Sequence, residues 1–446
     1  MTTVLAFVLV LGALIFFHEL GHFLLAKRAK VGVLKFSLGF GPKLLGVKRG
    51  ETEYLISALP LGGYVKMVGE DPTDESPEAM DPARSFSRKS VGARALIILA
   101  GPLANLLLPV AIFWGIFMVA GQAYLQPIVG TPEADSPVAR AGLLAGDRIQ
   151  AVDGAPIERW DEVDSAIRNS AGRLLSLTIL RQGRTFDVRL EPTIQRATDI
   201  FGQEIEVWGL GLRALIPSRI GQVLPGGVAQ QVGLKSGDRI VAVGGMPVAE
   251  WEQLAKVIHG SPGKPLLLTV ERDGQRIEVE ATPRPTRQQT PGGDEEVGLI
   301  GIGPSAEPTY RRLDPASALW AGAGKTLDIT VLTIQGFVKL LQAKISPKTI
   351  GGPILILQMT GEVAQRGLLD TLAFAALLSI NLAILNLLPI PILDGGHLLF
   401  AFIEWVRGKP VSLRLREYAQ RVGLVLLVLL MVFAFYNDIF RLLGRL

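Results

Sequence analysis

The residues most suited to chemistry lie near the start of the chain, in the run His18-Glu19-Leu20-Gly21-His22. Residues four apart share one face of an α-helix, so both imidazoles can reach a single Zn²⁺ ion. Glu19 is offset by one position, which suits it to take a proton from an attacking water rather than to bind the metal. With only four histidines in the chain, this spacing arises rarely by chance. The run predicts a hydrolytic zinc site; the alternative is a polar helix end that reaches the membrane surface.

A hydrolytic zinc site needs a third protein ligand and leaves its fourth position open. Cysteine is absent, so this ligand must be a His, an Asp or a Glu. Asp394 is the candidate, because it lies at the end of an apolar segment and can reach the depth of His22. His397, a few positions farther along, is the rival ligand. His259 is expected to be an ordinary surface residue.

The segment that leads to Asp394 reads Asn386-Leu-Leu-Pro-Ile-Pro-Ile-Leu-Asp-Gly-Gly. Pro389 and Pro391 interrupt a helix and free backbone groups that can line a cavity. Asn386 can donate a hydrogen bond from its side-chain amide to a developing oxyanion. These three residues are therefore candidates for contacting a bound substrate.

Both motifs fall in apolar segments that are long enough to cross a bilayer. We expect four spans, at 3–25, 93–121, 371–388 and 422–435 with flanking residues. The first gives about 34 Å of helix, and its ionisable residues and lack of a basic start argue against a signal peptide. Charged residues make up 19% of the chain, below the roughly 25% of globular domains. The chain is therefore expected to be a membrane protein.

Basic residues near the span ends set the expected orientation. They cluster after the first span, before the second, and between the third and fourth: Lys27, Arg28, Lys30, Lys35, Lys43, Arg88, Lys89, Arg407, Lys409, Arg414 and Arg416. These loops should be cytoplasmic, and the segment 122–370 should lie outside. The first and third spans then run in the same direction, which brings His22 and Asp394 to one depth.

Two further segments near the membrane carry polar residues. Lys325, Asp328, Gln335, Lys339 and Gln342 form one helical stripe, so 316–342 is expected to be an amphipathic helix on the membrane or on protein, not a span. Gly101-Pro-Leu-Ala-Asn105 is a polar break in the second span, which serves either the site or helix packing.

The outer segment contains an internal repeat. Gly142-Leu-Leu-Ala-Gly-Asp-Arg-Ile returns 91 residues later as Gly233-Leu-Lys-Ser-Gly-Asp-Arg-Ile, and Trp160 and Trp251 share this offset. Each copy reads strand, helix and hairpin, with Gln182-Gly183 or Asp273-Gly274 in the hairpin turn. The pattern resembles PDZ domains, which typically bind peptide C-termini beside an exposed strand. Peptide binding and a purely steric filter both stay open.

The two catalytic motifs together resemble those of the site-2 protease family of intramembrane zinc metalloproteases, and the similarity covers essentially the whole chain. Carried over by position, the resemblance implies that His18, His22 and Asp394 bind zinc and that Glu19 is the catalytic base. It also implies substrate contacts at Asn386, Pro389 and Pro391. The segments around Gly39-Phe-Gly41 and 53–67 are similar to the family's re-entrant β-loop, where an edge strand can hold an unwound substrate; the alternative is a cytoplasmic hairpin that merely packs.

The expected fold is a polytopic α-helical membrane protein with four transmembrane helices, a membrane-associated β-hairpin loop and two α+β PDZ-like domains. Its expected parts are an N-terminal membrane part, two PDZ-like domains, an amphipathic connector and a C-terminal membrane part, at 1–125, 126–215, 216–308, 309–369 and 370–446.

The resemblance implies cleavage of single-span membrane proteins, typically an anti-sigma factor already trimmed by another protease, and of remnant signal peptides. It places the protein in the bacterial cytoplasmic (inner) membrane, with the PDZ-like domains periplasmic and the site toward the cytoplasm. Expected partners are these substrates, peptide C-termini and the lipid bilayer. Nucleic acid is not expected, because the net charge is only +4 and no basic block is interleaved with aromatics. The alternatives are an inactive membrane-anchored PDZ adaptor and a metal transporter.

Overall fold

The computed structural model describes residues 2–70, 83–290, 293–305 and 308–444. These residues form two compact units. The first, here called the helical unit, comprises Met1–Gly121 and Arg312–Leu446, and the second, the repeat unit, comprises Gln122–Arg311. Each unit is described by itself.

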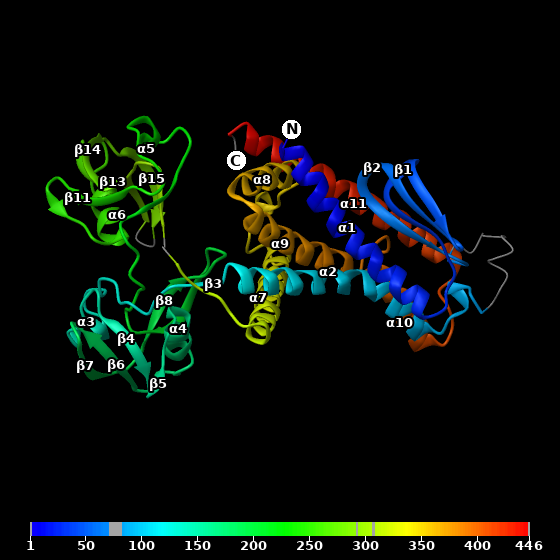
Figure 1. Cartoon of the computed structure of the whole chain (residues 1–446), viewed down its shortest axis with the longest axis horizontal. Coiled ribbons are helices and arrows are strands. Elements are labelled where there is room, and N and C mark those ends of the chain that lie inside the picture. The colour runs from blue at the N-terminus through cyan, green and yellow to red at the C-terminus, as the bar shows by residue number, and fades with distance from the viewer. Residues whose placement is uncertain (1, 71–82, 291–292, 306–307, 445–446) are drawn as a thin grey trace. The chain divides into compact units, whose positions relative to one another are not determined.

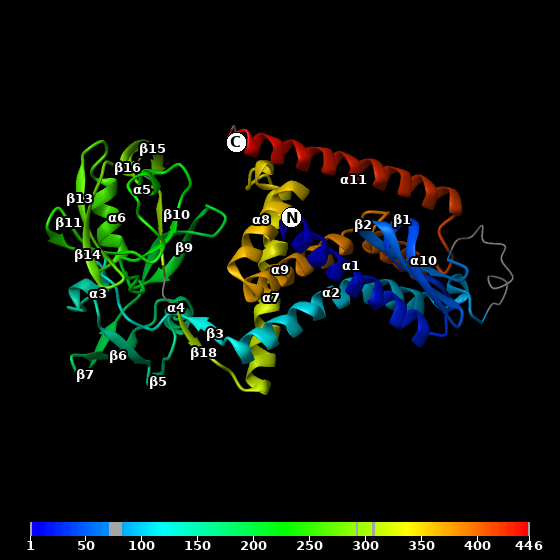
Figure 2. The ribbon, with the colours of Figure 1, turned by 45° about the horizontal axis from the view of Figure 1, so that its top comes forward.

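Four helices of the helical unit are long and apolar enough to cross a membrane. They are α1 (Thr2–Arg28), α2 (Val91–Val119), α9 (Leu368–Leu387) and α11 (Leu413–Leu442). Within the described residues, this confirms that the four predicted segments form helices long and apolar enough to span a membrane. The fourth is much longer than its apolar centre suggested, because α11 runs unbroken through polar turns at both ends (Figure 2).

The predicted amphipathic helix is α7 (Pro315–Leu341), which begins where the Asp314 side chain accepts the backbone N–H groups of Ala316 and Ser317. It is not among the helices of the described chain that are apolar enough to span a membrane. Gly322 lets α7 approach α2 closely, since a Cβ there would lie 3.0 Å from the backbone nitrogen of Trp114.

The predicted β-rich loop is a long antiparallel pair, β1 (Val33–Arg49) and β2 (Thr52–Met67). The register pairs Phe36 with Tyr54 on one side and with Val65 on the other, so the segment 33–38 lies between 52–57 and 63–67. Phe36 and Val65 are buried in a small core with Ile97 of α2. The same core contains Ala26 of α1, so the segment 63–67 is fixed beside α1.

The C-terminal part supplies shorter helices around the spans. They are α8 (Pro353–Arg366) and α10 (Asp394–Arg407), with single 3₁₀ turns at Phe86–Arg88 and Pro347–Thr349. Asp438, near the end of α11, accepts backbone N–H groups of Gly352, Ile354 and Leu355 at 2.9–3.1 Å. This carboxylate caps the positive N-terminal end of α8 and attaches it to α11.

The repeat unit contains two copies of one four-stranded sheet (Figure 1). In the first, the strand order is β5-β4-β6-β7, and in the second it is β12-β11-β13-β14. Their bounds are β4 (Arg148–Val152), β5 (Ala155–Pro156), β6 (Leu175–Arg181), β7 (Arg184–Leu190), β11 (Arg239–Val243), β12 (Met246–Pro247), β13 (Leu266–Arg272) and β14 (Gln275–Ala281). The predicted sequence of strand, helix and hairpin is confirmed in both copies.

Helices and further strand pairs complete each copy. The helices are α3 (Pro137–Arg140), α4 (Trp160–Arg168), α5 (Val228–Gln231) and α6 (Trp251–His259). The remaining pairs are β8 (Thr193–Thr198) with β9 (Glu204–Gly209), β10 (Ile220–Val223) with β17 (Ile302–Pro304), β15 (Arg284–Thr290) with β16 (Gly293–Leu299), and β3 (Gln122–Tyr124) with β18 (Thr309–Arg311). Gln182 and Gly183 both have positive φ, as do Asp273 and Gly274, which is the backbone of a tight hairpin turn.

The Asp of the repeated motif has a structural role in both copies. Asp147 is 1% exposed and its carboxylate accepts two hydrogen bonds from Arg181 at 2.6 Å and one from the backbone of Leu144. Asp238 and Arg272 form the same pair. Burial raises the pKa of each carboxyl, but the hydrogen bonds from the arginines outweigh it and hold the pKa below its usual value.

The two copies contact each other through Glu250. This side chain is 4% exposed and accepts the backbone N–H of Thr131 at 2.8 Å and its hydroxyl at 3.1 Å. Arg213 also bridges Glu133 and Glu252, but it is 55% exposed, and such pairs contribute little. Glu250 is therefore the main polar link between the copies.

We expect Glu250→Ala to loosen this link, because each hydrogen bond to a charged group contributes about 1.5–3 kcal/mol. The chain has no cysteine, so spin labels can be placed at single introduced cysteines in the full-length protein, at Arg184 and Gln275. The distance distribution between the labels should broaden in the variant. Glu280→Ala, at an exposed position of β14, is the control. If the distance distribution in Glu250→Ala is as narrow as in the labelled protein that keeps Glu250, then Glu250 is not the main link between the copies.

Candidate metal centre

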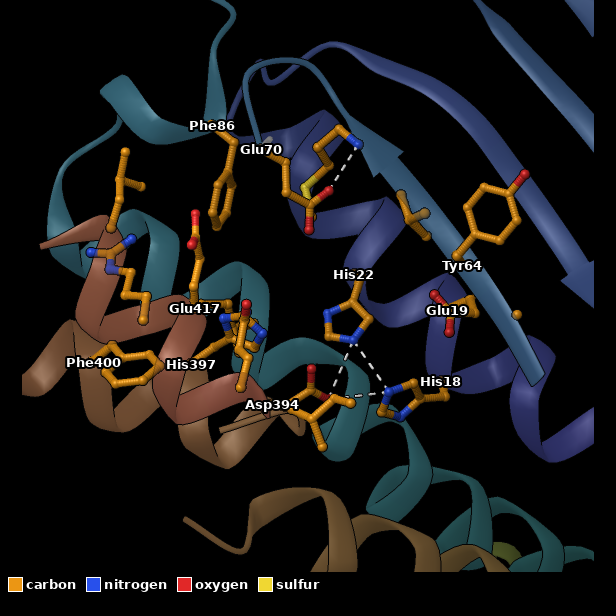
Figure 3. A pocket seen from close by; sticks show the side chains of 18 residues that line it. His18, Glu19, His22, Tyr64, Glu70, Phe86, Asp394, His397, Phe400 and Glu417 are labelled. Atoms are coloured by element: carbon orange, nitrogen blue, oxygen red, sulfur yellow. Dashed lines mark hydrogen bonds and ion pairs between the residues drawn. The ribbon is translucent and has the colours of Figure 1, made fainter. Parts of the chain in front are cut away.

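His18 and His22 lie on the same face of α1, as their spacing predicts, and their Nε2 atoms are 3.3 Å apart. Asp394 is the first residue of α10, and its Oδ2 atom lies 3.1 Å from Nε2 of His18 and 3.5 Å from Nε2 of His22 (Figure 3). The expectation that His22 and Asp394 reach one depth is confirmed. Two elements far apart in the sequence thus present three ligand atoms to one point.

These three side chains fit a zinc ion. One ligand atom from each lies within 4.8 Å of the others. Oδ2 of Asp394 is buried and, within the described chain, has no well-formed hydrogen bond to satisfy it. Two imidazole nitrogens and one carboxylate oxygen are a donor set that zinc accepts, with a fourth position left for water or substrate.

The ring of His22 is held from behind by α2. Its Nδ1 donates to the backbone carbonyl of Ile97 at 2.9 Å, which leaves the Nε2 lone pair free toward Asp394. Gly101 makes room for the ring, because a Cβ at this position would lie 2.2 Å from Nε2 of His22. Gly21 allows α1 to approach the carbonyl of Ala100 in the same way. The predicted polar break in α2 therefore packs directly against the histidines.

Glu19 faces the same cavity but is not one of the three clustered ligands. It is 9% exposed and lies against the segment 63–67 of β2, where a Cβ on Gly63 would come within 2.9 Å of Cγ of Glu19. Figure 3 shows its carboxylate beside His18 and His22, with Tyr64 nearby. This placement leaves Glu19 free to exchange a proton with a molecule in the cavity.

The cavity has a volume of about 490 Å³ and is built by α1, β2, α10 and the first turns of α11. Sequence reasoning did not identify several of its lining residues, namely Tyr64, Glu70, Phe400, Arg416, Glu417 and Gln420. Nothing local marks these residues, because they come from separate segments that only the fold brings together. The charged and amide groups among them line the cavity beside apolar residues such as Phe86 and Ile98.

His397, the rival ligand, lines the cavity without joining the three-residue cluster. Burial lowers the pKa of its imidazole below the usual value. It lies three positions after Asp394, on nearly the same face of α10 but almost one turn farther along the helix.

Asn386, Pro389 and Pro391 are not among the residues that line this cavity. Asn386 lies in the last turn of α9, and the two prolines lie in the short connection of bends and turns that separates α9 from α10. The glycines after Asp394 fit against this connection, because a Cβ on Gly395 would lie 2.3 Å from the carbonyl of Leu387. In the structure the segment therefore places Asp394, and the predicted substrate contacts stay predictions.

Ion pairs hold α10 in position. Glu404 accepts a hydrogen bond from Arg94 of α2 at 2.6 Å and lies 3.6 Å from Arg416 of α11. The Arg94 and Glu404 side chains are each 12% exposed, so the pair is well shielded from water. Shielded pairs of this kind are costly to break. Asp394 is therefore carried by a helix fixed to two of the spans.

Comparison with known proteins gives matches along nearly the whole chain. Residues 6–430 match the model of Peptidase family M50. The Regulator of sigma-E protease RseP of Escherichia coli (strain K12) is 37% identical, over 98% of each chain. Protease RseP of Yersinia pestis is 36% identical, again over 98% of each chain. Among solved structures, the PDZ domain of an SdrC-like protein from Listeria monocytogenes is 21% identical to this chain. The match covers 21% of this chain and 87% of that domain. Its TM-score of 0.16 is too low to establish a shared fold.

Proposed function

Since this chain belongs to peptidase family M50, the site-2 proteases, and is a zinc metalloprotease, we propose that it cleaves peptide bonds of single-span membrane proteins at the cavity between α1, β2 and α10. The observation that carries this proposal is the convergence of His18, His22 and Asp394, within 4.8 Å of one another, beside Glu19 in one cavity. A purely structural metal site would not need Glu19.

In the proposed mechanism, His18, His22 and Asp394 hold zinc, and Glu19 is the general base. When bound, zinc lowers the pKa of a water and polarises the scissile carbonyl. Glu19 takes the proton of the attacking water and returns it to the leaving amine. Glu19 can serve both steps because its carboxylate lies beside the ligands without belonging to them.

A substrate helix must be unwound before it can be cleaved, since proteases act on extended chains. The segment 63–67 lines the cavity and is paired with 33–38 on one side. We propose that an extended substrate adds to this segment by backbone hydrogen bonds. Contacts of the substrate with Asn386, Pro389 and Pro391 belong to the same proposal and require the connection before α10 to open.

The proposed substrates are a trimmed anti-sigma factor and remnant signal peptides, because the Escherichia coli relative is named Regulator of sigma-E protease. The proposed location is the bacterial inner membrane, with the site toward the cytoplasm and the repeat unit on the periplasmic side. There the two repeats, as PDZ-like domains at 126–215 and 216–308, would bind new peptide C-termini or exclude untrimmed substrates. The basic loops after α1 and before α11 support this orientation.

Removal of zinc tests the proposal. The full-length protein, purified in detergent, is incubated with a tagged single-span model substrate before and after treatment with a chelator. Cleavage should fall to background after chelation and return when zinc is added back, because the ligands remain in place. A chelated sample that still cleaves would contradict zinc-dependent hydrolysis. A preparation that never cleaves any single-span substrate, although it binds zinc, would favour the inactive adaptor.

A further inference from the structure

We propose that Asn105 is a positioning residue of the metal centre: its side-chain oxygen accepts the Nδ1–H of His18 and fixes the ring so that Nε2 faces the metal. This inference rests on the proposed function, because it requires that His18 and His22 bind zinc. It concerns α2, an element that supplies none of the three ligands.

Asn105 lies directly behind His18. It is 0% exposed, and its side-chain amide is 3.3 Å from Nδ1 of His18. Its backbone carbonyl accepts a hydrogen bond from the Ser379 hydroxyl of α9 at 2.7 Å. The residue is thus held between two spans, and its side chain has little freedom to move away from the imidazole.

The chemistry of the two rings assigns the direction of this hydrogen bond. A neutral imidazole carries one N–H, so a ring that offers the Nε2 lone pair to a metal must carry its hydrogen on Nδ1. His22 follows this rule, since its Nδ1 faces the carbonyl of Ile97, which can only accept. His18 presents Nε2 to Asp394 in the same way and needs an acceptor at Nδ1. Asn105 is the side chain that faces this nitrogen.

The amide of Asn105 has the nitrogen toward His18, and its Oδ1 atom is buried without a hydrogen-bond partner in the described chain. A half turn of a carboxamide exchanges oxygen and nitrogen without changing the space that they fill. The half turn gives Oδ1 a donor and gives the Nδ1–H of His18 an acceptor. With zinc bound, the acceptor orientation is therefore the stable one.

Hydrogen bonds of this kind orient a ligand and raise its basicity, and loss of one typically costs about 10- to 100-fold in metal affinity. We expect Asn105→Leu, which keeps the approximate shape but has no acceptor, to weaken zinc binding by this factor. Asn105→Asp should retain the affinity, because a carboxylate accepts the same N–H. A comparison of the zinc affinities of Asn105→Asp and Asn105→Leu therefore separates the effect of the hydrogen bond from the effect of packing.

The measurement is competition for Zn²⁺ between a chelator of known affinity and the full-length protein in detergent. Thr360→Val is the control, since it removes a buried side-chain hydrogen bond to the carbonyl of Ile356 in α8 and leaves Asn105 and His18 unchanged, and its zinc affinity should match the wild type. Thermal unfolding of each zinc-free variant checks that it is folded, and Asn105→Ala replaces the Leu variant if that one does not fold.

Three results would overturn the inference. Zinc affinity in a folded acceptor-free variant equal to that of the wild type would show that the contact has no role. Equal weakening in the Asp and Leu variants would show that Asn105 acts through packing alone. A wild-type protein that binds no zinc would overturn the proposed metal site, and this inference with it.

Discussion

Replacing Glu19 with Gln is expected to slow peptide cleavage by about 10²- to 10⁴-fold, the usual contribution of a general base. Glutamine keeps the size of the side chain and its place beside segment 63–67, but an amide cannot take a proton from water. Zinc content should stay at the wild-type level, because Glu19 lies outside the cluster of His18, His22 and Asp394. This variant should therefore lose cleavage activity and keep its zinc.

The measurement is cleavage of a tagged single-span substrate by the purified full-length protein, with zinc determined on the same samples. Asp370→Asn is a matched control, because it makes the same carboxyl-to-amide change at an exposed position in the first turn of α9. It should cleave like the wild type. Equal cleavage by Glu19→Gln would remove Glu19 from the mechanism and would point to a contaminating protease.

Replacing Asp394 with Ala is expected to abolish both zinc binding and cleavage. The change leaves two imidazoles as the only ligands of the cluster, and loss of a direct ligand should cost more than the roughly 100-fold upper range for an outer partner. The expected result is a zinc affinity reduced by more than about 100-fold, with no cleavage at stoichiometric zinc. Chelator competition and substrate cleavage on the full-length protein measure the two effects.

His397→Ala provides the comparison for this variant. Both side chains line one cavity, but only Asp394 lies within 4.8 Å of the ligand atoms of both His18 and His22. His397→Ala should therefore keep wild-type zinc affinity. The reverse pattern, with zinc lost from His397→Ala and retained by Asp394→Ala, would assign the third ligand to His397.

The spacing of two histidines in the sequence determined the part of the candidate metal centre that lies on α1. His18 and His22 are four residues apart, and the regular geometry of a helix places them on one face whatever surrounds it. The spans followed from the length and composition of apolar segments, and the repeats from matches at one offset. The Gln182-Gly183 turn followed from the backbone preferences of its residues. All of these are local properties of the polypeptide.

Tertiary structure decided which distant residues complete the site. Asn105 contacts His18 across 87 positions, and nothing in the residues around Asn105 names its partner. Glu417 enters the cavity from α11, a helix that the sequence shows only by its apolar centre. The choice between Asp394 and His397 likewise depends on the direction in which α10 leaves the connection after α9.

The pair β1–β2 and the connection before α10 show the same difference between what the sequence predicts and what the fold decides. The family resemblance predicted a β-loop at 53–67, but the placement of 33–38 between 52–57 and 63–67 depends on pairing with distant backbone. The prolines at 389 and 391 predicted a helix break, and the packing of Gly395 against Leu387 shows how that break places Asp394. Local periodicity and composition act over a few residues and can be read from the sequence. Contacts between spans depend on how whole helices pack, and that is fixed only when the chain is folded.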